Sequence, residues 1–300
     1  MNNILLDHNI EDYISSLEVN AATHELYEKN LHYFKDWAIR HYRRSFRDFK
    51  SATGFVRDYK RYLVERKEIK ANVVNNYIAP IRGYLKYKYG YDVAIRCMRL
   101  PEYHLRDSLQ KTQIRELYSQ INIDVLKGKR DLSIFKLCVS CGLRSHELVN
   151  IKFSDMVNRN GRFVIYILGK GRRQKDEFVV PNQSAIDALS SYMSALRNKF
   201  VLGDDSYVFV SLSNHGAGHK ITTRGVRYIV DKYLISAGLK GTGRYSTHSL
   251  RHSTANIAFD NGADIRVVKR LMRHKSLGTT QIYIDERERL ENGAENLIDV

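Results

Sequence analysis

Apolar residues recur with a helical period through most of the first hundred residues. In the stretch 23–39, Leu31, Phe34 and Trp37 are spaced three apart, as on the buried face of an amphipathic helix. Two later stretches repeat this spacing: 51–66, which opens with the N-cap residue type Ser51, and 73–90, which ends at a glycine. The pattern predicts about four helices in this part of the chain.

Beyond Pro101 the pattern becomes one of helices interrupted by strands. A helix is expected from Ser108 or Thr112, and a later helix is broken by the glycine at position 142. Two β-rich runs, 162–168 and 176–181, flank a basic turn that contains glycine, which is typical of a β-hairpin. Further helical stretches follow at 185–200, 246–262 and 264–276.

Together these elements predict a fold that is mainly α with a small antiparallel β-sheet. The segment around Pro101 has the character of a linker, so we expect two domains, residues 1–103 and residues 104–300. A chain of 300 residues is long enough for both to have a hydrophobic core.

The charge balance narrows the class of partner. The chain has 49 Lys and Arg against 33 Asp and Glu, a net charge of +16. Residues 40–70 alone hold eleven bases and four acids, with aromatic residues between them. A surplus of this size favours a polyanion such as nucleic acid, although a basic helix face can also be no more than a solvated surface.

Cysteine usage and hydropathy indicate a cytoplasmic location. Three cysteines are too few for a disulfide framework, so we expect a reducing compartment. The amino-terminal residues lack the basic and apolar segments of a signal peptide. The strongest apolar run, 163–168, is too short to cross a bilayer, so no membrane partner is expected.

Two pairs of residues raise the alternative of a zinc site. Cys138 and Cys141 form a C-x-x-C pair, and His248 and His252 form an H-x-x-x-H pair. More than a hundred residues separate the pairs, and position 249 is Ser where a zinc protease has its catalytic Glu. The sequence therefore favours no metal and no cofactor.

A different chemistry fits several polar residues that lie beside glycines or turns. Breaking a phosphodiester without a metal needs fixed cations for the phosphate oxygens, a nucleophile, and groups that accept and donate protons. Arginine suits the first task because its planar guanidinium can bind two oxygens at once. The candidates, each weak alone, are Arg144, Glu147, Lys170, His248, Arg251, His274 and Tyr283.

The order of these residues resembles the tyrosine recombinase (phage integrase) family over about residues 108–290. "CGLRSHEL" is similar to the family's first arginine box, "GKG" to its hairpin lysine, and "HSLRHSTA" to its H-x-L-R-H box. "LMRH" is similar to the L-G-H box, and "TTQIY" to the segment with the nucleophile. Arg273 departs from the pattern because the family has glycine there.

The resemblance implies a role for each candidate. Tyr283 would attack the scissile phosphate to form a 3′-phosphotyrosine, with His248 as base and Lys170 as general acid. Lys175 is a weaker rival for the acid. Arg144 and Arg251 would clamp the phosphate oxygens, His274 would donate a hydrogen bond, and Glu147 would orient its neighbours. Residue His252 is expected to be a structural neighbour, buried or hydrogen-bonded.

The resemblance also implies a helical core-binding (SAM-like) domain, a catalytic domain, and a Xer-like or Cre-like two-domain layout. The expected partner is double-stranded DNA of the nucleoid, bound by a homo-tetramer on paired sites and passing through a Holliday junction. The free protein would be a monomer or weak dimer, and the tail after Tyr283 would dock in cis or in trans. An accessory protein or second recombinase stays open. Two alternatives are a type IB topoisomerase-like strand transferase and an inactive DNA-binding regulator.

Overall fold

The computed structural model describes residues 10–41, 49–99, 107–169, 172, 174–214, 216–274 and 276–291. The chain divides into two compact units, Met1–Pro101 and Glu102–Val300. Over these residues the fold is mainly α with a small antiparallel sheet, as the hydrophobic pattern predicts.

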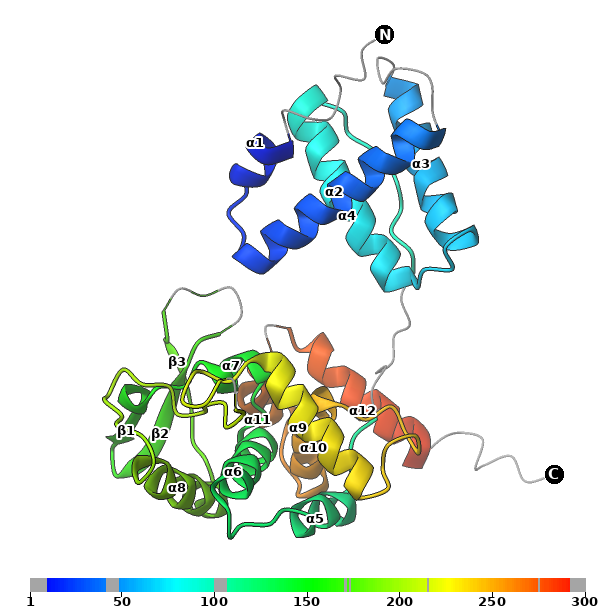
Figure 1. Cartoon of the computed structure of the whole chain (residues 1–300). Helices are drawn as coiled ribbons and strands as arrows, with labels where there is room; N and C mark the ends of the chain where they lie inside the picture. Colours follow the sequence, from blue (N-terminus) through cyan, green and yellow to red (C-terminus); the bar gives the residue numbers. More distant parts are fainter. Residues whose placement is uncertain are drawn as a thin grey trace, which may run out of the picture. The chain divides into compact units, whose positions relative to one another are not determined.

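The first unit contains four helices within its described residues: α1 (Ile10–Ser15), α2 (Ala21–His41), α3 (Phe49–Glu65) and α4 (Ala71–Tyr89) (Figure 1). Helix α4 contacts each of the other three, so it organises the unit. Phe34, Tyr59 and Tyr84 are completely or almost completely buried among them. Because α3 begins at Phe49, Ser51 lies inside its first turn, and the prediction of Ser51 as the N-cap is wrong.

The second unit supplies the remaining described helices. They are α5 (Lys111–Ser119), α6 (Leu126–Cys141), α7 (Ser145–Val149), η1 (Phe153–Asp155), α8 (Gln183–Arg197), α9 (Thr223–Ser236), α10 (Thr247–Asp260), α11 (Ile265–Met272) and α12 (Gly278–Glu291). Helix α6 is the centre of this unit, because α8, α9 and α10 all pack against it. Its residues Ile134, Phe135 and Leu137 have no exposed surface.

The sheet has three strands in the order β1 (Met156–Arg159), β2 (Arg162–Ile167) and β3 (Glu177–Val179). Both neighbouring pairs are antiparallel. The hairpin of β2 and β3 agrees with the sequence prediction, whereas β1 was not predicted. Asn160 and Gly161 connect β1 to β2 with positive φ values of 51° and 74°, the conformation of a tight two-residue hairpin turn.

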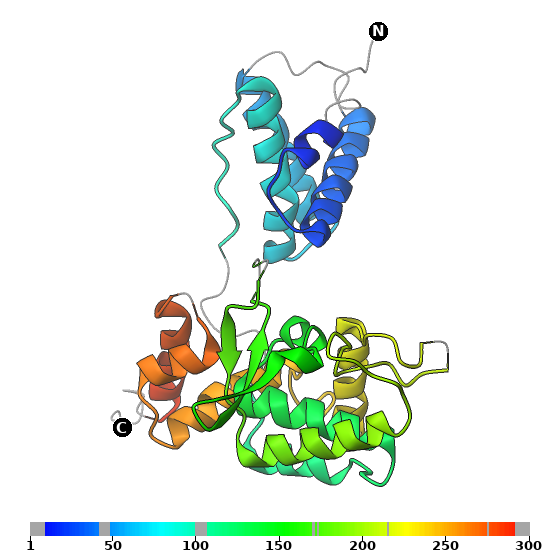
Figure 2. The ribbon, with the colours of Figure 1, turned by 90° about the vertical axis from the view of Figure 1, so that its left-hand side faces the viewer.

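The helices α10 and α11 bring the C-terminal part of the chain to one end of α6. Thr254 on α10 donates its hydroxyl to the carbonyls of Cys138 and Val139 on α6, and Leu109 donates its backbone N–H to Ser253. Figure 2 shows α11 and α12, in orange and red, on one flank of the green strands. The region where α6, α10 and α11 meet holds most of the candidate site residues.

Across the described part of the chain, no helix combines the length and apolar character that a membrane span requires.

Candidate active site

The first part of the site is built where α6 ends. Gly142 follows α6 with φ 56°, and a Cβ there would lie 3.0 Å from Met272 Sδ, so both conformation and space favour glycine. The chain then enters α7 with Arg144 as the residue before the helix. Glu147, 1% exposed, accepts the Arg144 backbone N–H at 2.8 Å and its guanidinium Nη1 at 2.6 Å.

The Glu147 carboxylate therefore fixes both the backbone and the side chain of Arg144. Burial alone would raise the pKa of Glu147, but the charge of Arg273 and the hydrogen bonds and charge of Arg144 outweigh it and hold the pKa below its usual value. Glu147 is thus ionised at neutral pH, and 28% of the Arg144 side chain is exposed to solvent.

Helix α10 carries the second arginine. Arg251 is 5% exposed, and its two terminal nitrogens donate to the backbone carbonyls of Gly142 and Met272. Burial, with the charges of Arg144 and Arg273, lowers its pKa to about 9, while Glu147 and Tyr283 oppose that shift. Arg251 therefore has Arg144, Arg273, Glu147 and Tyr283 as electrostatic neighbours.

The two histidines of α10 differ in their surroundings. His248 is exposed at the start of the helix. His252, one turn later, is half-buried, and its Nδ1 lies 2.5 Å from the hydroxyl of Tyr283. His252 is hydrogen-bonded as the sequence predicts, but its partner is the candidate nucleophile, which the sequence did not indicate.

The segment after α11 carries His274, and α12 carries Tyr283. The ring of His274 stacks on that of Tyr283 with centroids 6.3 Å apart, and its Nδ1 lies 2.9 Å from the hydroxyl of Thr280. Thr280 has no exposed surface, so this contact fixes the orientation of the imidazole. Tyr283 is 4% exposed and packs against Ala255 and Met272.

The hairpin lysine, Lys170, lies outside the described residues. Its rival Lys175 is described, and its ammonium donates to the carboxylate of Asp155 and, at 2.7 Å, to the carbonyl of Asn150. An ammonium held by a partly buried carboxylate is occupied with a structural contact.

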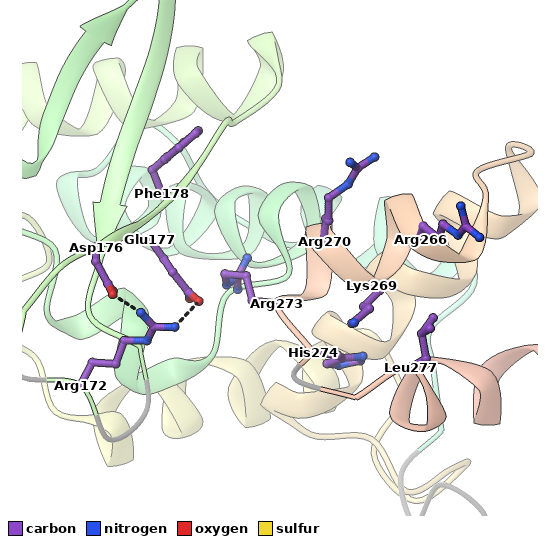
Figure 3. Close-up of a pocket in the computed structure, with 10 residues that line it drawn as sticks. All are labelled: Arg172, Asp176, Glu177, Phe178, Arg266, Lys269, Arg270, Arg273, His274 and Leu277. Carbon is purple, nitrogen blue, oxygen red and sulfur yellow. Dashed lines mark hydrogen bonds and ion pairs between the residues drawn. The ribbon is translucent and has the colours of Figure 1, made fainter.

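A cleft of about 680 Å³ adjoins this cluster, with His274 and Arg273 in its lining. One wall is the start of β3, where Arg172 is bound by Asp176 and Glu177, and the other is α11 with its basic residues (Figure 3). Because two acids balance Arg172, the excess positive charge of the cleft comes from α11, and an anionic ligand fits this wall.

The cysteines of the zinc alternative are core residues in the last turn of α6. Cys138 and Cys141 are buried in the helical core, and burial raises the pKa of each thiol to about 12. Both are consequently protonated core residues at neutral pH. Within the described ranges, no three His, Cys, Asp or Glu side chains are grouped so as to hold a metal ion.

Sequence reasoning missed three residues that complete the geometry. They are His252 as the contact of Tyr283, Thr280 as the contact of His274, and Arg273 as a second partner of Glu147. The only signal for Thr280 was its place in "TTQIY", and the only signal for Arg273 was its departure from the expected glycine. The contacts join residues up to 126 positions apart, which no local pattern reveals.

Residues 107–289 match the model of the phage integrase family. The chain belongs to the phage integrase family of tyrosine recombinases. It is also 30% identical to the tyrosine recombinase XerC of Halalkalibacterium halodurans, with 89% of this chain and 88% of that protein covered. Tyrosine recombinase XerD of Yersinia pestis is 29% identical, with 91% of each chain covered. The protein is accordingly a site-specific DNA recombinase.

Solved recombinase structures share the fold. A XerH site-specific recombinase bound to its difH substrate after cleavage has a TM-score of 0.70 at 20% identity, covering 91% of this chain and 79% of that one. A λ integrase fragment bound as a dimer to a core site has a TM-score of 0.68 at 16% identity, covering 93% and 94%.

Proposed function

We propose that this recombinase cuts and rejoins double-stranded DNA with Tyr283 as nucleophile. The observation that supports the proposal is the single cluster of Arg144, Arg251, Glu147 and Tyr283, with His274 stacked on the tyrosine. Two guanidiniums in the same cluster as a tyrosine provide what phosphate transfer without a metal requires.

The cleavage step conserves one phosphate ester bond. The Tyr283 oxygen forms a bond to phosphorus, the bond from phosphorus to the 5′ oxygen breaks, and a 3′-phosphotyrosine and a free 5′ hydroxyl result. Arg144 and Arg251 stabilise the charge on the non-bridging oxygens, and His274 donates a hydrogen bond. A 5′ hydroxyl of a partner duplex then reverses the step, and two rounds pass through a Holliday junction.

Two protons have to move during cleavage. A free tyrosine has a pKa of about 10, so at neutral pH its proton needs an acceptor. We assign that task to His248, whose exposure leaves it accessible to a DNA ligand, and assign His252 to holding the hydroxyl before DNA binds. Lys170 protonates the leaving 5′ oxygen, since Lys175 is bound by Asp155.

We also propose how the protein assembles on DNA. The first unit serves as the core-binding domain, and a homo-tetramer forms on two paired sites from protein that is monomeric or weakly dimeric when free. The net charge of +16 supports binding to duplex DNA. The proposed location of the protein is the cytoplasm, where it would bind the DNA of the nucleoid.

A suicide-substrate assay tests the nucleophile. Nicked duplexes with a randomised core would be incubated with the protein. The short fragment that carries the free 5′ hydroxyl then diffuses away, which traps the covalent complex, and the DNA of this complex is sequenced. We expect a protein–DNA adduct at Tyr283 from the unchanged chain and none from Tyr283→Phe, while DNA binding by the variant is retained.

The other outcomes separate the alternatives. No adduct with unaltered DNA binding would indicate an inactive regulator. Adducts on every sequence, with relaxation of a supercoiled plasmid by the monomer, would indicate a topoisomerase-like strand transferase. Adducts that survive Tyr283→Phe would contradict the assignment of the nucleophile.

A further inference from the structure

Arg273 occupies a backbone position that normally suits glycine. It follows α11 with φ 52° and ψ 46°, the left-handed region, which is unfavourable for a residue with a side chain. Yet its side chain is 7% exposed, buried rather than turned to solvent. A long charged residue in such a place needs compensating interactions, and the guanidinium makes several.

The first set of interactions joins two helix ends. One terminal nitrogen, Nη1, donates to the carbonyl of Cys141 at 3.0 Å and to that of Leu271 at 2.8 Å. The other, Nη2, donates to the carbonyl of Gly142 at 2.9 Å. The last carbonyls of α6 and α11 lack helical partners, so Arg273 caps both helices and ties together the segments that carry Arg144 and His274.

The second interaction is with the carboxylate that holds Arg144. Arg273 Nη2 donates to Glu147 Oε2 at 2.8 Å, the oxygen that also accepts the Arg144 backbone N–H. The other oxygen, Oε1, accepts the Arg144 side chain. One buried negative charge is therefore shared by two guanidiniums.

This sharing changes the potential where a phosphate would bind. In the absence of Arg273, the buried carboxylate would keep Arg144 as its ion pair, with Arg251 as a further electrostatic neighbour, so more of its charge would act on Arg144 and weaken the attraction of Arg144 for a phosphate. With Arg273 present, Glu147 can orient the Arg144 side chain through Oε1 while Arg273 neutralises the carboxylate charge through Oε2. The arrangement retains the orienting carboxylate and the positive charge together.

We propose that Arg273 is a positioning residue for strand cleavage, which acts by neutralising Glu147 and so leaving the charge of Arg144 available to the scissile phosphate. The proposal rests on the proposed function of Tyr283 and the two arginines. It goes beyond the family's motif, in which this position is a glycine and carries no charge.

The test compares single-turnover cleavage at saturating protein, on a suicide duplex recovered from the library. Arg273→Gly suits the left-handed backbone, so the variant is expected to fold, and its melting temperature checks this. We expect its cleavage rate to fall about 10- to 100-fold, as for a misplaced catalytic group. Arg270→Ala, which removes one exposed charge three residues away, is the matched control and should lose less.

A double variant distinguishes the electrostatic role from a merely structural one. If Arg273 acts by neutralising Glu147, then Glu147→Gln added to Arg273→Gly removes the unbalanced charge and should restore part of the rate. Arg273→Lys, which keeps the charge with fewer donors, should lie between Arg273→Gly and the unchanged chain.

Two results would overturn the proposal: a cleavage rate of Arg273→Gly equal to that of the unchanged chain, or a double variant no faster than Arg273→Gly. Failure of the proposed function looks different, because then the unchanged chain would itself give no Tyr283 adduct.

Discussion

His248 and His252 are one helical turn apart on α10, and His252 is hydrogen-bonded to Tyr283. The sequence pattern assigns the base to His248, while the 2.5 Å contact places His252 beside the hydroxyl. Because general bases contribute about 10²- to 10⁴-fold, His248→Ala should slow single-turnover cleavage by at least a hundredfold. His252→Ala should slow it by about tenfold or less, since it loses a contact rather than the proton acceptor.

The measurement is adduct formation against time, with the rescue of each variant by added imidazole as a second readout. Imidazole should restore His248→Ala, because it replaces a proton acceptor at an exposed position. If His252→Ala is the slower variant and is the one that imidazole restores, the two roles have to be exchanged.

At the residue scale, the sequence named the groups but not their partners. The order of the motifs predicted Arg144, Arg251, His274 and Tyr283 as site residues through its resemblance to the family. It did not identify Thr280 or the four acceptors of Arg273, because those contacts depend on how α6, α11 and α12 pack. Hydrophobic periodicity carries no information about such polar contacts.

At the element scale, the junction between α6 and α7 depends on Gly142. Ala at this position would keep φ 56° only with strain, about 1–2 kcal/mol, and its Cβ would also press on Met272 Sδ. Gly262 has φ 82° and open space where a Cβ would lie, so it is the matched control for strain alone. Gly142→Ala should lower the free energy of unfolding by about 1–3 kcal/mol more than Gly262→Ala, the usual cost of overpacking.

Urea unfolding followed by circular dichroism measures this difference. The single tryptophan, Trp37, lies in the first unit, so its fluorescence reports that unit separately. Both glycine variants should leave the fluorescence transition unchanged. Equal losses in Gly142→Ala and Gly262→Ala would show that contact with Met272 contributes nothing.

The elements with strong periodicity were predictable, and the short exposed ones were not. The helices α2, α10 and α11 follow from apolar spacing and from N-terminal residues such as Ser246 and Asp264. Strand β1 has four residues and no buried one, so alternation could not reveal it. The Asn160–Gly161 pair was its one available signal, because this dipeptide favours a two-residue hairpin turn.

At the scale of the whole molecule, Glu147 links the charge cluster to the stability of the second unit. Its pKa in the folded protein is below the ordinary value of 4.5, so the unfolded chain takes up the proton first as the pH falls. The ionised Glu147 carboxylate contributes its full stabilisation of the folded protein well above pH 4.5. This contribution is lost as the pH falls through the lowered pKa of Glu147. Glu147→Gln should therefore unfold at lower urea than the unchanged chain at pH 7, with the gap narrowing below pH 4.5. A gap that is the same at pH 7 and at pH 3.5 would contradict this linkage.

The C-terminal tail can influence Tyr283 during assembly on DNA. The reason is that α12, a continuous helix from Gly278 to Glu291, carries Tyr283 and leads directly into the tail. A tail that binds a neighbouring copy would act on the nucleophile through this helix, whereas a tail packed in cis would not. The final nine residues, 292–300, lie outside the described residues and include the apolar Leu297, Ile298 and Val300.

A chain ending at Glu291 separates the two cases. If the tail binds in trans, the shortened chain should bind a single half-site with unchanged affinity but lose cooperativity on the full two-arm site recovered from the library. Mass photometry would then show single occupancy where the complete chain gives paired complexes, and cleavage on the full site should fall in proportion. Unchanged cooperativity in the shortened chain would instead assign the tail to its own protomer. In that case the position of Tyr283 would be set within each copy, by its contacts with His252 and His274.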